Sequence, residues 1–506
     1  MPRLALAATL LVPLGALLVG ACNAEFCDIV ECTSAQGGQG GGGAGGSTST
    51  STGEGGTIDP GCIPSMLPAG AAVPATCGVF VDADANGTGT QADPLKRLDD
   101  AIALAETPDK PSVIYVCGAP ELAGSFEMKG GTSLFGGLDC GTWTYDPANR
   151  PKIVGMANAP ALAVRDDGQS FLADIDIDAA PGQGEGQSSI GLLVHLASVT
   201  VDRVSVSASD GSEGAEGEPP MTFSTPAQSG ALQNCPNMQG ANPGTNMCEG
   251  TPTSGGNGGA VSNPIGLAGA PGSPPAIGGD GGLSVMDCNA GGQGQPGDSP
   301  GPAVSMSALD EFDLGTLSSS GFTVSVAPDG IAGAPGGGGG GGRGGPVRCG
   351  GGGGGAGGCG GAGGGGGQSG GASLAIAVLD GVLTLGSGVK LATGSGGTGG
   401  NGVAGANGQQ GGAGSIFMPM MPSDLDGCPG GAGGTGGAGS GGAGGNGGLS
   451  ALIFLQGSAT STGEPETPMI GMGGTFGLGG DGMAPNGSDG AECRLFHAGA
   501  MDPCEM

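Results

Sequence analysis

Three aspartates at alternate positions are the residues of this chain best suited to binding a cation. Asp174, Asp176 and Asp178 flank Ile175 and Ile177, so an extended strand would place the three carboxylates on one face. Clustered carboxylates are the ligands that calcium prefers. The same alternation describes an ordinary half-buried strand with its isoleucines inward and its aspartates in water, and we favour that interpretation.

A second acidic pattern lies nearer the N-terminus. Asp82, Asp84 and Asn86 precede Gly87 at the spacing of the first half of a calcium-binding loop, with Asp93 at the twelfth position. Such a loop normally ends in Glu, which reaches the ion with both oxygens, and no helix pattern precedes Asp82. A simple turn explains the same residues. Calcium therefore stays the minor alternative, and we expect no other cofactor.

These candidates lie in a chain of repeated short strand patterns. Five copies can be aligned, at residues 161–177, 191–206, 303–326, 373–391 and 449–455. Most of them alternate apolar with polar residues and end in a small residue and a glycine turn. Self-similar strands without intervening helices predict a solenoid, in which each coil buries its apolar face on the next. A β-sandwich with glycine-rich loops is the alternative.

Three glycine-rich arms interrupt the repeats. Between Gly330 and Ala372, 28 of the 43 residues are Gly. Such arms are either disordered, the default for this composition, or packed as extended polyglycine helices whose bare backbones bond laterally. Glycine does not recur at the strict period of collagen, and the aspartate spacing of a calcium-binding β-roll is missing. Projecting arms favour interaction over catalysis.

The region between residues 77 and 207 combines a strand at 78–82, a Gly-Thr turn, an amphipathic helix over 98–105 and a strand at 112–116. Its motif residues are Gly89, Thr90, Pro94, Leu98 and Ala101. This order resembles the N-terminal cap of pectin-lyase-like proteins. The resemblance implies an all-β chain: a right-handed parallel β-helix, or solenoid, with a short N-terminal capping helix and long glycine-rich insertions.

Polysaccharide lyases of that family use calcium-binding carboxylates and an Arg or Lys base in a cleft. The candidate bases here are Arg165, Arg203 and Lys390, and further acids are Asp166, Asp167 and Asp202. No hydrolase dyad or nucleophile elbow is recognisable. With 13 Lys plus Arg against 45 Asp plus Glu, the net charge is −32. That charge disfavours a groove for anionic polysaccharides and argues against nucleic acid as a partner.

The N-terminus indicates export. An apolar stretch from Leu4 to Val19 follows Arg3 and is too short for a confident membrane span. It leads into Gly20-Ala21-Cys22, which resembles the bacterial lipoprotein signal. The resemblance implies cleavage before Cys22, attachment of diacylglycerol and palmitate-type chains to it, and an outer-membrane or cell-surface location. A plain secretory signal, with Cys22 in a disulfide, is the alternative.

Cysteine usage agrees with an oxidising compartment. Of the 15 Cys residues, 14 remain when Cys22 is set aside, an even number suited to disulfides. Zinc is disfavoured because no Cys-x-x-Cys pair occurs and the two histidines are isolated. Connectivity cannot be deduced from sequence, but proximity suggests five local pairs: Cys27 with Cys32, Cys62 with Cys77, Cys117 with Cys140, Cys235 with Cys248, and Cys349 with Cys359.

The expected organisation follows from these features. It comprises a signal peptide (1–21), a lipid anchor with a Gly/Ser/Thr tether (22–61), a cap with the first coils (62–160), repeats (161–207), an arm (208–301), a repeat (302–326), an arm (327–371), a repeat (372–392), an arm (393–448) and a last repeat with the tail (449–506). The arms are similar in composition to glycine-rich surface proteins of myxobacteria and mycobacteria. We expect a non-enzymatic, membrane-anchored surface lipoprotein with a structural, adhesive or matrix-interaction role. The alternative is a polysaccharide lyase or glycan-binding protein, with surface or matrix polysaccharide as its partner.

Overall fold

The computed structural model describes residues 58–233, 235, 237–284, 288, 290–300, 314–416, 426–500 and 503–505. Contacts divide the chain into residues 1–58 and 59–506, and all secondary structure reported below belongs to the second unit. This unit is nearly all β, with parallel sheets. Helices in the described residues are α1 (Leu98–Ala105) and two single 3₁₀ turns, η1 (Pro60–Cys62) and η2 (Pro64–Met66).

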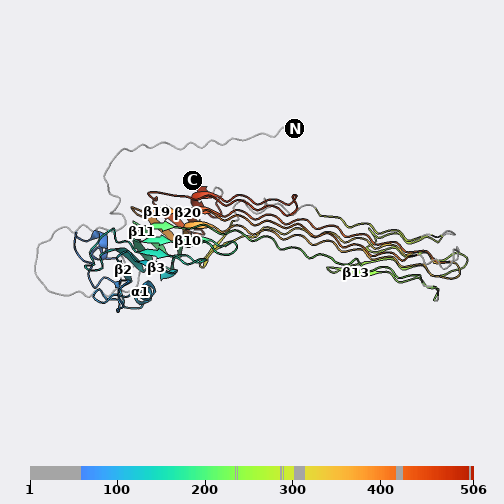
Figure 1. The fold of residues 1–506 in the computed structure, drawn as a ribbon, viewed down its shortest axis with the longest axis horizontal. Helices are drawn as coiled ribbons and strands as arrows, with labels where there is room; N and C mark the ends of the chain where they lie inside the picture. The colour runs from blue at the N-terminus through green and yellow to red at the C-terminus, as the bar shows by residue number, and fades with distance from the viewer. Residues whose placement is uncertain are drawn as a thin grey trace, which may run out of the picture. The chain divides into compact units, whose positions relative to one another are not determined.

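Three sheets make up the strand-rich part of this unit (Figure 1). Sheet I contains β1 (Val79–Val81), β2 (Val113–Cys117), β5 (Ser133–Leu138), β8 (Gln169–Ala173), β11 (Ser198–Asp202), β18 (Val382–Leu385) and β21 (Thr460–Thr462). Sheet II contains β3 (Glu121–Ala123), β6 (Lys152–Val154), β9 (Asp176–Asp178), β12 (Ser205–Ser207) and β19 (Lys390–Ala392). Sheet III contains β4 (Phe126–Lys129), β7 (Leu162–Arg165), β10 (Ser189–His195), β17 (Ser373–Leu379), β20 (Ser450–Gln456), β22 (Glu492–His497) and β23 (Cys504–Glu505). Only the last pair of sheet III, β22 with β23, is antiparallel.

From β2 to β21 the chain passes through sheets I, II and III in that order, and each passage adds a strand beside the previous one. Equivalent side chains therefore stack in register between successive turns. In sheet II, Leu122, Ile153, Ile177, Val206 and Leu391 are consecutive partners, and none is more than 8% exposed. Burying one such side chain stabilises the fold by about 1.5–3 kcal/mol. The alternation read from the sequence thus sets which residues fill the core.

Left-handed backbone recurs at the corner between sheets I and II. Gly118, Gly137, Asp174, Arg203 and Gly388 occupy this corner in successive turns, with φ of 71°, 69°, 56°, 51° and 66°. Glycine adopts this conformation freely, whereas a side chain costs about 1–2 kcal/mol there. The two non-glycine residues therefore need compensating contacts, which are described below.

Helix α1 connects β1 to β2 and spans the residues that the sequence predicts to be helical. Leu98, Ala101, Ile102 and Ala105 are buried on one face, because they recur at helical spacing. Aspartates in the first turn complement the positive end of the helix dipole.

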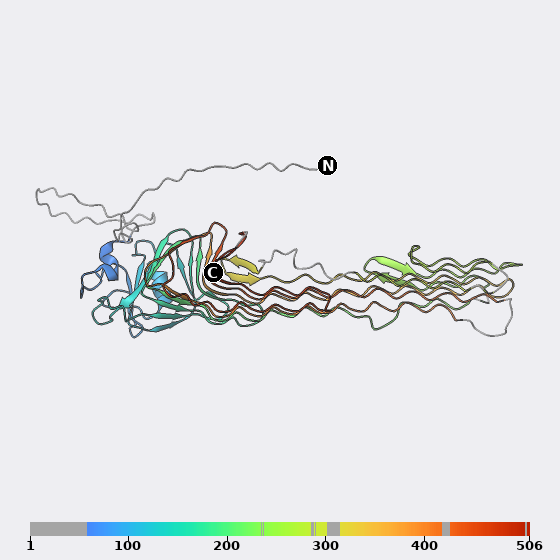
Figure 2. The ribbon, with the colours of Figure 1, turned by 90° about the horizontal axis from the view of Figure 1, so that it is seen from above.

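The glycine-rich segments lie side by side as extended chains (Figure 2). We call the described parts of residues 208–300, 327–372, 393–448 and 463–491 the polyglycine bundle. Its backbone hydrogen bonds repeat every third residue: Gly358, Gly361 and Gly364 donate to the carbonyls of Gly434, Gly437 and Ser440 at 2.9, 2.8 and 3.0 Å. A three-residue period is that of a polyproline II helix, whereas a β-ladder repeats every two residues. Of the two states left open by the sequence, these residues adopt the packed one.

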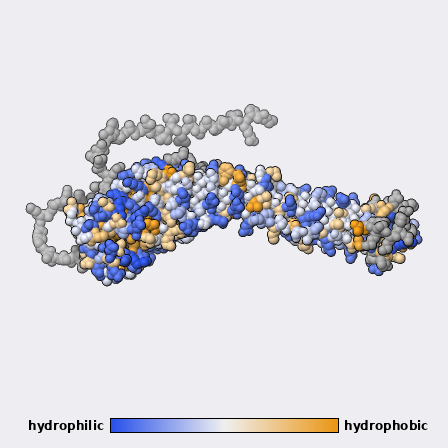
Figure 3. Space-filling view, viewed as in Figure 1, coloured by the Kyte–Doolittle hydropathy of each residue, from blue (hydrophilic) through white to orange (hydrophobic). Residues whose placement is uncertain are grey.

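Glycine is required in the bundle for space. No glycine from residue 330 to 371 has a left-handed φ. A Cβ on Gly358 would lie 1.9 Å from the Gln409 carbonyl oxygen, and one on Gly361 would lie 1.9 Å from that of Ala406. Neighbouring backbones therefore approach each other so closely that only the hydrogen atoms of glycine fit between them. In Figure 3, the surface of the bundle is paler than that of the sheets, because glycine has an intermediate hydropathy.

One face of the central segment 350–371 accepts larger side chains. Ala356, Cys359, Ala362 and Gln368 are separated by multiples of three and so lie on the same face of a three-residue helix. Ser369 is the exception, and its hydroxyl contacts the hydroxyl of Ser325 at 2.9 Å. The spacing of the non-glycine residues in the sequence therefore reports how the segment packs.

Disulfides link segments both in the strand-rich part and in the polyglycine bundle. Cys62 bonds Cys77 and Cys117 bonds Cys140, which are two of the local pairs expected from the sequence. Two other expected pairs require correction: Cys235 bonds Cys349, and Cys248 bonds Cys359. The segments that carry these cysteines run side by side in the same direction, as the hydrogen bonds from Ala241 and Gly244 N–H to the Gly351 and Gly354 carbonyls show. Cysteines far apart in sequence therefore meet, and proximity along the chain is a poor guide there. The remaining disulfides are Cys288–Cys428 and Cys493–Cys504. Cys27 and Cys32 lie outside the described residues.

Two antiparallel hairpins accompany the parallel sheets. The first, β13 (Thr245–Cys248) with β14 (Thr251–Ser254), belongs to the bundle. The second, β15 (Gly315–Ser318) with β16 (Gly321–Val324), occupies the described part of residues 302–326, which the sequence predicts to be a repeat coil. The difference arises because alternation of apolar and polar residues does not distinguish a parallel strand from a hairpin strand. Residues 463–491 likewise join the bundle, although the sequence assigns them to the tail.

Candidate functional site

The outer face of sheet II carries a row of charged and polar side chains. Lys152, Asp176, Ser205 and Lys390 are register partners across four adjacent strands. Their neighbours along each strand point into the core, so the strand period of two sends these residues outward. Asp176 and Asp178 therefore share one face, as the sequence predicts, but Asp174, expected on the same face, lies at the left-handed corner before β9.

These side chains border a groove of about 540 Å³. It is lined by Pro147, Arg150, Lys152, Asp174, Asp176, Asp178, Arg203, Ser205, Gly388, Lys390 and Glu466. Four strands of sheet II, the corner beside them and the loop before β6 supply most of the set. The groove thus gathers the sequence candidates Asp174, Asp176, Asp178, Arg203 and Lys390 in one place.

Basic side chains neutralise the aspartates of the groove. Arg150 binds Asp176 at 2.6 Å, and Lys152 forms an ion pair with Asp178, which also accepts a hydrogen bond from Ser207 Oγ at 2.6 Å. The pairs connect neighbouring turns of the chain, because Lys152 and Asp178 lie on the adjacent strands β6 and β9, and Arg150 lies in the loop just before β6. Much of the charge in the groove is therefore already balanced within the protein.

The corner end of the groove holds the most buried of these pairs. Arg203 donates from Nε and Nη2 to the two carboxylate oxygens of Asp174, at 2.8 and 2.9 Å. The Asp174 side chain is only 2% exposed, and it also accepts a hydrogen bond from the Tyr145 hydroxyl at 3.1 Å. Arg203 makes a further ion pair with Asp202.

Arg150 stabilises the same corner through the backbone. Its guanidinium donates to the carbonyl oxygens of Arg203 and Ile175, at 2.7 and 2.9 Å, in addition to Asp176. These contacts occupy the carbonyls of two adjacent turns where the chain leaves sheet I. Arg150 therefore ties the strained Arg203 to Ile175, the residue that follows the strained Asp174.

The titration of the groove residues does not suit proton abstraction. Burial disfavours the charged form of Arg203, but the hydrogen bonds and charges of Asp174 and Asp202 outweigh it and raise the pKa above its ordinary value. The hydrogen bond to Asp178 raises the pKa of Lys152, and burial together with Asp174 raises the pKa of Tyr145. A general base works best with a pKa near the ambient pH, and these shifts run the other way.

The three aspartates singled out for calcium do not converge on a common point. Among the described residues, the metal-like grouping of His, Cys, Asp or Glu is Asp82 with Cys117 and Cys140. The two sulfurs of that grouping are bonded to each other, so they offer no thiolate. Asp174, Asp176 and Asp178 instead contact Arg203, Arg150 and Lys152.

The acidic residues near the N-terminus form a turn. Asp82 accepts a hydrogen bond from the Asp84 N–H at 3.0 Å, and Asp93 accepts two from Thr88, at 3.1 and 2.9 Å. A Cβ on Gly87 would lie 2.2 Å from the Asp93 carboxylate, which explains the glycine. Asn86 lies in the same turn, so these residues have the turn-forming role that the sequence favours.

Two groove residues and one residue beside the groove carry roles that the sequence interpretation did not assign. Arg150 and Lys152 supply the cations, and Tyr145 caps Asp174. The alternation Lys152-Ile153-Val154 is visible in the sequence and could have placed Lys152 outward. Of the remaining candidates, Arg165 binds Glu127 at 2.6 Å on sheet III, away from the groove.

No protein-family model, curated protein or solved structure matches the chain significantly. Within the described residues, no helix is long and apolar enough to cross a membrane. Cys22 and the signal-like segment before it lie outside the described residues.

Proposed function

We propose that residues 77–207, 373–392, 449–462 and 492–506 form a right-handed parallel β-helix, from which the polyglycine bundle projects. The order of the strands supports this proposal, because from β2 to β20 each passage through sheets I, II and III adds one strand to each. The segments of the bundle inserted after β12, β19 and β21 each return to sheet III. A β-helix tolerates such insertions at its corners, since the coils continue stacking on either side.

On this scaffold the protein acts as a lipid-anchored surface protein with a structural or adhesive role. The observation that carries the proposal is the polyglycine bundle, which displays side chains in a regular row. Along residues 396–416, every third side chain is exposed, at Thr398, Asn401, Ala404, Asn407, Gln410, Ala413 and Ile416. Three residues of such a helix advance about 9 Å, so neutral groups recur at that interval for an extended partner to contact.

A carbohydrate-active function is the second candidate, and the groove of sheet II favours it. The groove is large enough for a sugar, and it contains the carboxylate–arginine cluster expected of a lyase. Against it stand the internal ion pairs and the raised pKa values of Lys152 and Arg203. The adhesive role therefore ranks first.

Metabolic labelling with a palmitate analogue tests the anchor. The full chain, expressed in a Gram-negative host, should incorporate the label and fractionate with the outer membrane. Cys22→Ala should abolish labelling, whereas Cys27→Ala, five residues on, should retain it. Labelling that persists in Cys22→Ala would refute lipid attachment at this residue.

An adhesion assay beside a lyase assay separates the two functions. Beads coated with the unlipidated chain (residue 22 onward, carrying Cys22→Ser) should bind cells or matrix and should not cleave polyuronates. Lys390→Ala is the diagnostic variant, because Lys390 lines the groove and has no ion pair with another described residue. Cleavage by the wild type that this variant loses would favour the lyase.

A further inference from the structure

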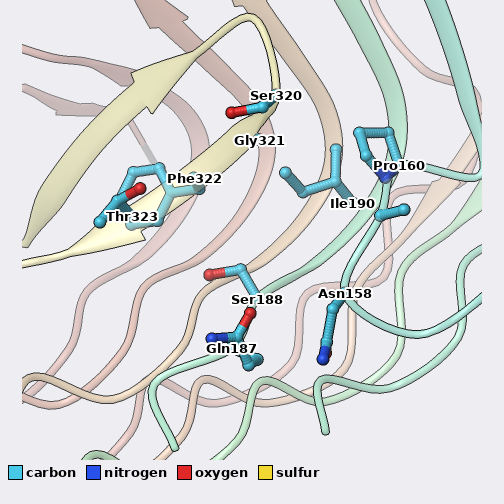
Figure 4. Close-up of a pocket in the computed structure, with 10 residues that line it drawn as sticks. Asn158, Pro160, Gln187, Ser188, Ile190, Ser320, Gly321, Phe322 and Thr323 are labelled. Atoms are coloured by element: carbon cyan, nitrogen blue, oxygen red, sulfur yellow. The ribbon is translucent and has the colours of Figure 1, made fainter. Parts of the chain in front are cut away.

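A second cavity lies between the β15–β16 hairpin and the N-terminal ends of strands β7 and β10 of sheet III, and it shares no lining residue with the charged groove (Figure 4). Its volume is about 290 Å³. It is lined by Asn158, Ala159, Pro160, Gln187, Ser188, Ile190, Ser320, Gly321, Phe322 and Thr323. The hairpin forms one wall, and the loops before β7 and β10 form the other.

Two contacts fix the hairpin that forms this wall. The amide of Gln456 on β20 accepts a hydrogen bond from Leu317 N–H at 2.8 Å and donates one to Leu317 O at 3.0 Å. Phe322 meets Phe454 edge to face, with ring centroids 5.4 Å apart. The partly exposed ring is therefore held by an aromatic neighbour beneath it, and the cavity is pre-formed.

None of the ten lining residues is charged, although the chain as a whole carries −32. Figure 4 shows Phe322 and Ile190 on facing sides of the cavity, with Gln187, Ser188 and Asn158 grouped at one end. Ser188 Oγ accepts a hydrogen bond from Ala372 N–H, which leaves its own proton available, and Thr323 Oγ1 has no hydrogen bond to another described residue. The cavity thus combines an aromatic surface with uncharged donors and acceptors.

We propose that this cavity binds one neutral sugar residue of a surface or matrix glycan. A pyranose ring has a face of C–H groups and an edge of hydroxyls. The weakly positive C–H face suits the negative face of the Phe322 ring, and the hydroxyls suit the amides and hydroxyls at the rim. This inference rests on the adhesive function proposed above and supplies its ligand class.

The size of the cavity limits the ligand. Sites for larger ligands extend to about 1,000 Å³, so a cavity near the lower limit holds one ring rather than an oligosaccharide. One uncharged, solvent-open subsite is expected to bind with a Kd of about 1 mM. Many anchored copies on one cell would raise the effective affinity through simultaneous contacts.

Saturation-transfer NMR with titration tests the proposal on the unlipidated chain with Cys22→Ser. The probes are glucose, galactose, mannose and N-acetylglucosamine, with glucuronate and galacturonate as charged counterparts. At least one neutral sugar should bind, and the uronates should bind less well because the chain is strongly negative. Phe322→Leu, which keeps an apolar side chain on Phe454, should weaken binding by about fivefold or more.

Thr323→Val keeps the shape of the side chain and removes its hydroxyl, and should weaken binding by about two- to tenfold. Thr316→Val is the matched control, because Thr316 is the register partner of Thr323 on the same hairpin and does not line the cavity. The proposal is overturned if no neutral sugar binds more tightly than about 10 mM. It is also overturned if the uronates bind equally well, or if both cavity variants bind like the wild type.

The bead assay keeps the two proposals apart. Adhesion without sugar binding would overturn the cavity assignment and leave the adhesive function in place. Sugar binding without adhesion would support the cavity and overturn the adhesive role.

Discussion

Asp174 and Arg203 occupy the same corner in consecutive turns of the chain and bind each other through two hydrogen bonds. Both have left-handed backbone, at a corner where the turns on either side use Gly137 and Gly388. Placing two side chains there costs about 2–4 kcal/mol of backbone strain in all. The ion pair offsets that cost, since each residue supplies the partner that the other needs.

Replacing Asp174 by Asn should show the effect of the carboxylate charge without added backbone strain, because Asn tolerates left-handed backbone. The Asn amide would direct an N–H toward one N–H of Arg203, so the free energy of unfolding should fall by about 2–4 kcal/mol. Asp176→Asn is the control: its side chain is 32% exposed, and the loss should be about 1 kcal/mol or less. Urea unfolding measures both, and equal losses would contradict the special role of the corner.

Gly361→Ala should disrupt the bundle. Its Cβ would lie 1.9 Å from the Ala406 carbonyl oxygen, and overpacking of this kind costs about 1–3 kcal/mol. Hydrogen exchange should accelerate in residues 353–368 and 400–412, with little change in sheet I. Asn407→Ala, an exposed site on the same neighbouring segment, should leave exchange unaltered. If Gly361→Ala exchanged like Asn407→Ala, the close packing of backbones would be wrong.

The disulfide between Cys248 and Cys359 should stabilise the bundle selectively. With the Cys235–Cys349 disulfide in place it closes a loop of about 25 residues, for which chain entropy predicts about 3–4 kcal/mol. Replacing both cysteines by Ser should raise exchange in residues 241–259 and 351–371, as measured by mass spectrometry. The double replacement at Cys62 and Cys77 should instead raise exchange around η1 and β1, where that disulfide lies. A uniform change in both variants would argue against local fastening.

Asp380 should contribute to stability in a pH-dependent way. Hydrogen bonds from the backbone and hydroxyl of Ser458 lower its pKa below the ordinary 3.8, with a smaller effect from His195. Because the folded pKa is depressed, the contribution is present above the unfolded pKa and is lost as pH falls through the folded pKa. The stability difference between wild type and Asp380→Asn should therefore be present near pH 7 and shrink progressively as the pH falls below the unfolded pKa. A difference that persists in acid would refute the assignment.

Local patterns in the sequence predict much of the strand-rich part. The helix Leu98–Ala105 and the strands around Ile177 and Val206 follow from spacing alone, because burial on one face is a property of a few consecutive residues. The parallel register is harder to predict from the sequence, since it depends on which turns of the chain are neighbours in space. The hairpin at Gly315–Val324 shows the limit, because its alternation fits either arrangement.

The candidate site was only partly predictable for the same reason. Asp176 and Asp178 face outward as alternation requires, but their partners Arg150 and Lys152 come from the preceding turn. The disulfide from Cys235 to Cys349 depends on how distant arms align. The sequence of the arms does indicate their three-residue helical period, since the non-glycine residues Ala356, Cys359, Ala362 and Gln368 are separated by multiples of three.

The glycine-rich arms should change length only in triplets during evolution. Deleting Gly357 would move Cys359 into the place of Gly358, where its Cβ would meet the Gln409 carbonyl at 1.9 Å. Every later side chain would turn by a third of a revolution and lose its assigned neighbour. Removing three residues would shorten the arm and leave each remaining side chain facing the direction it had before. Related arms should therefore differ by multiples of three residues, much as a coding sequence tolerates indels that preserve its frame.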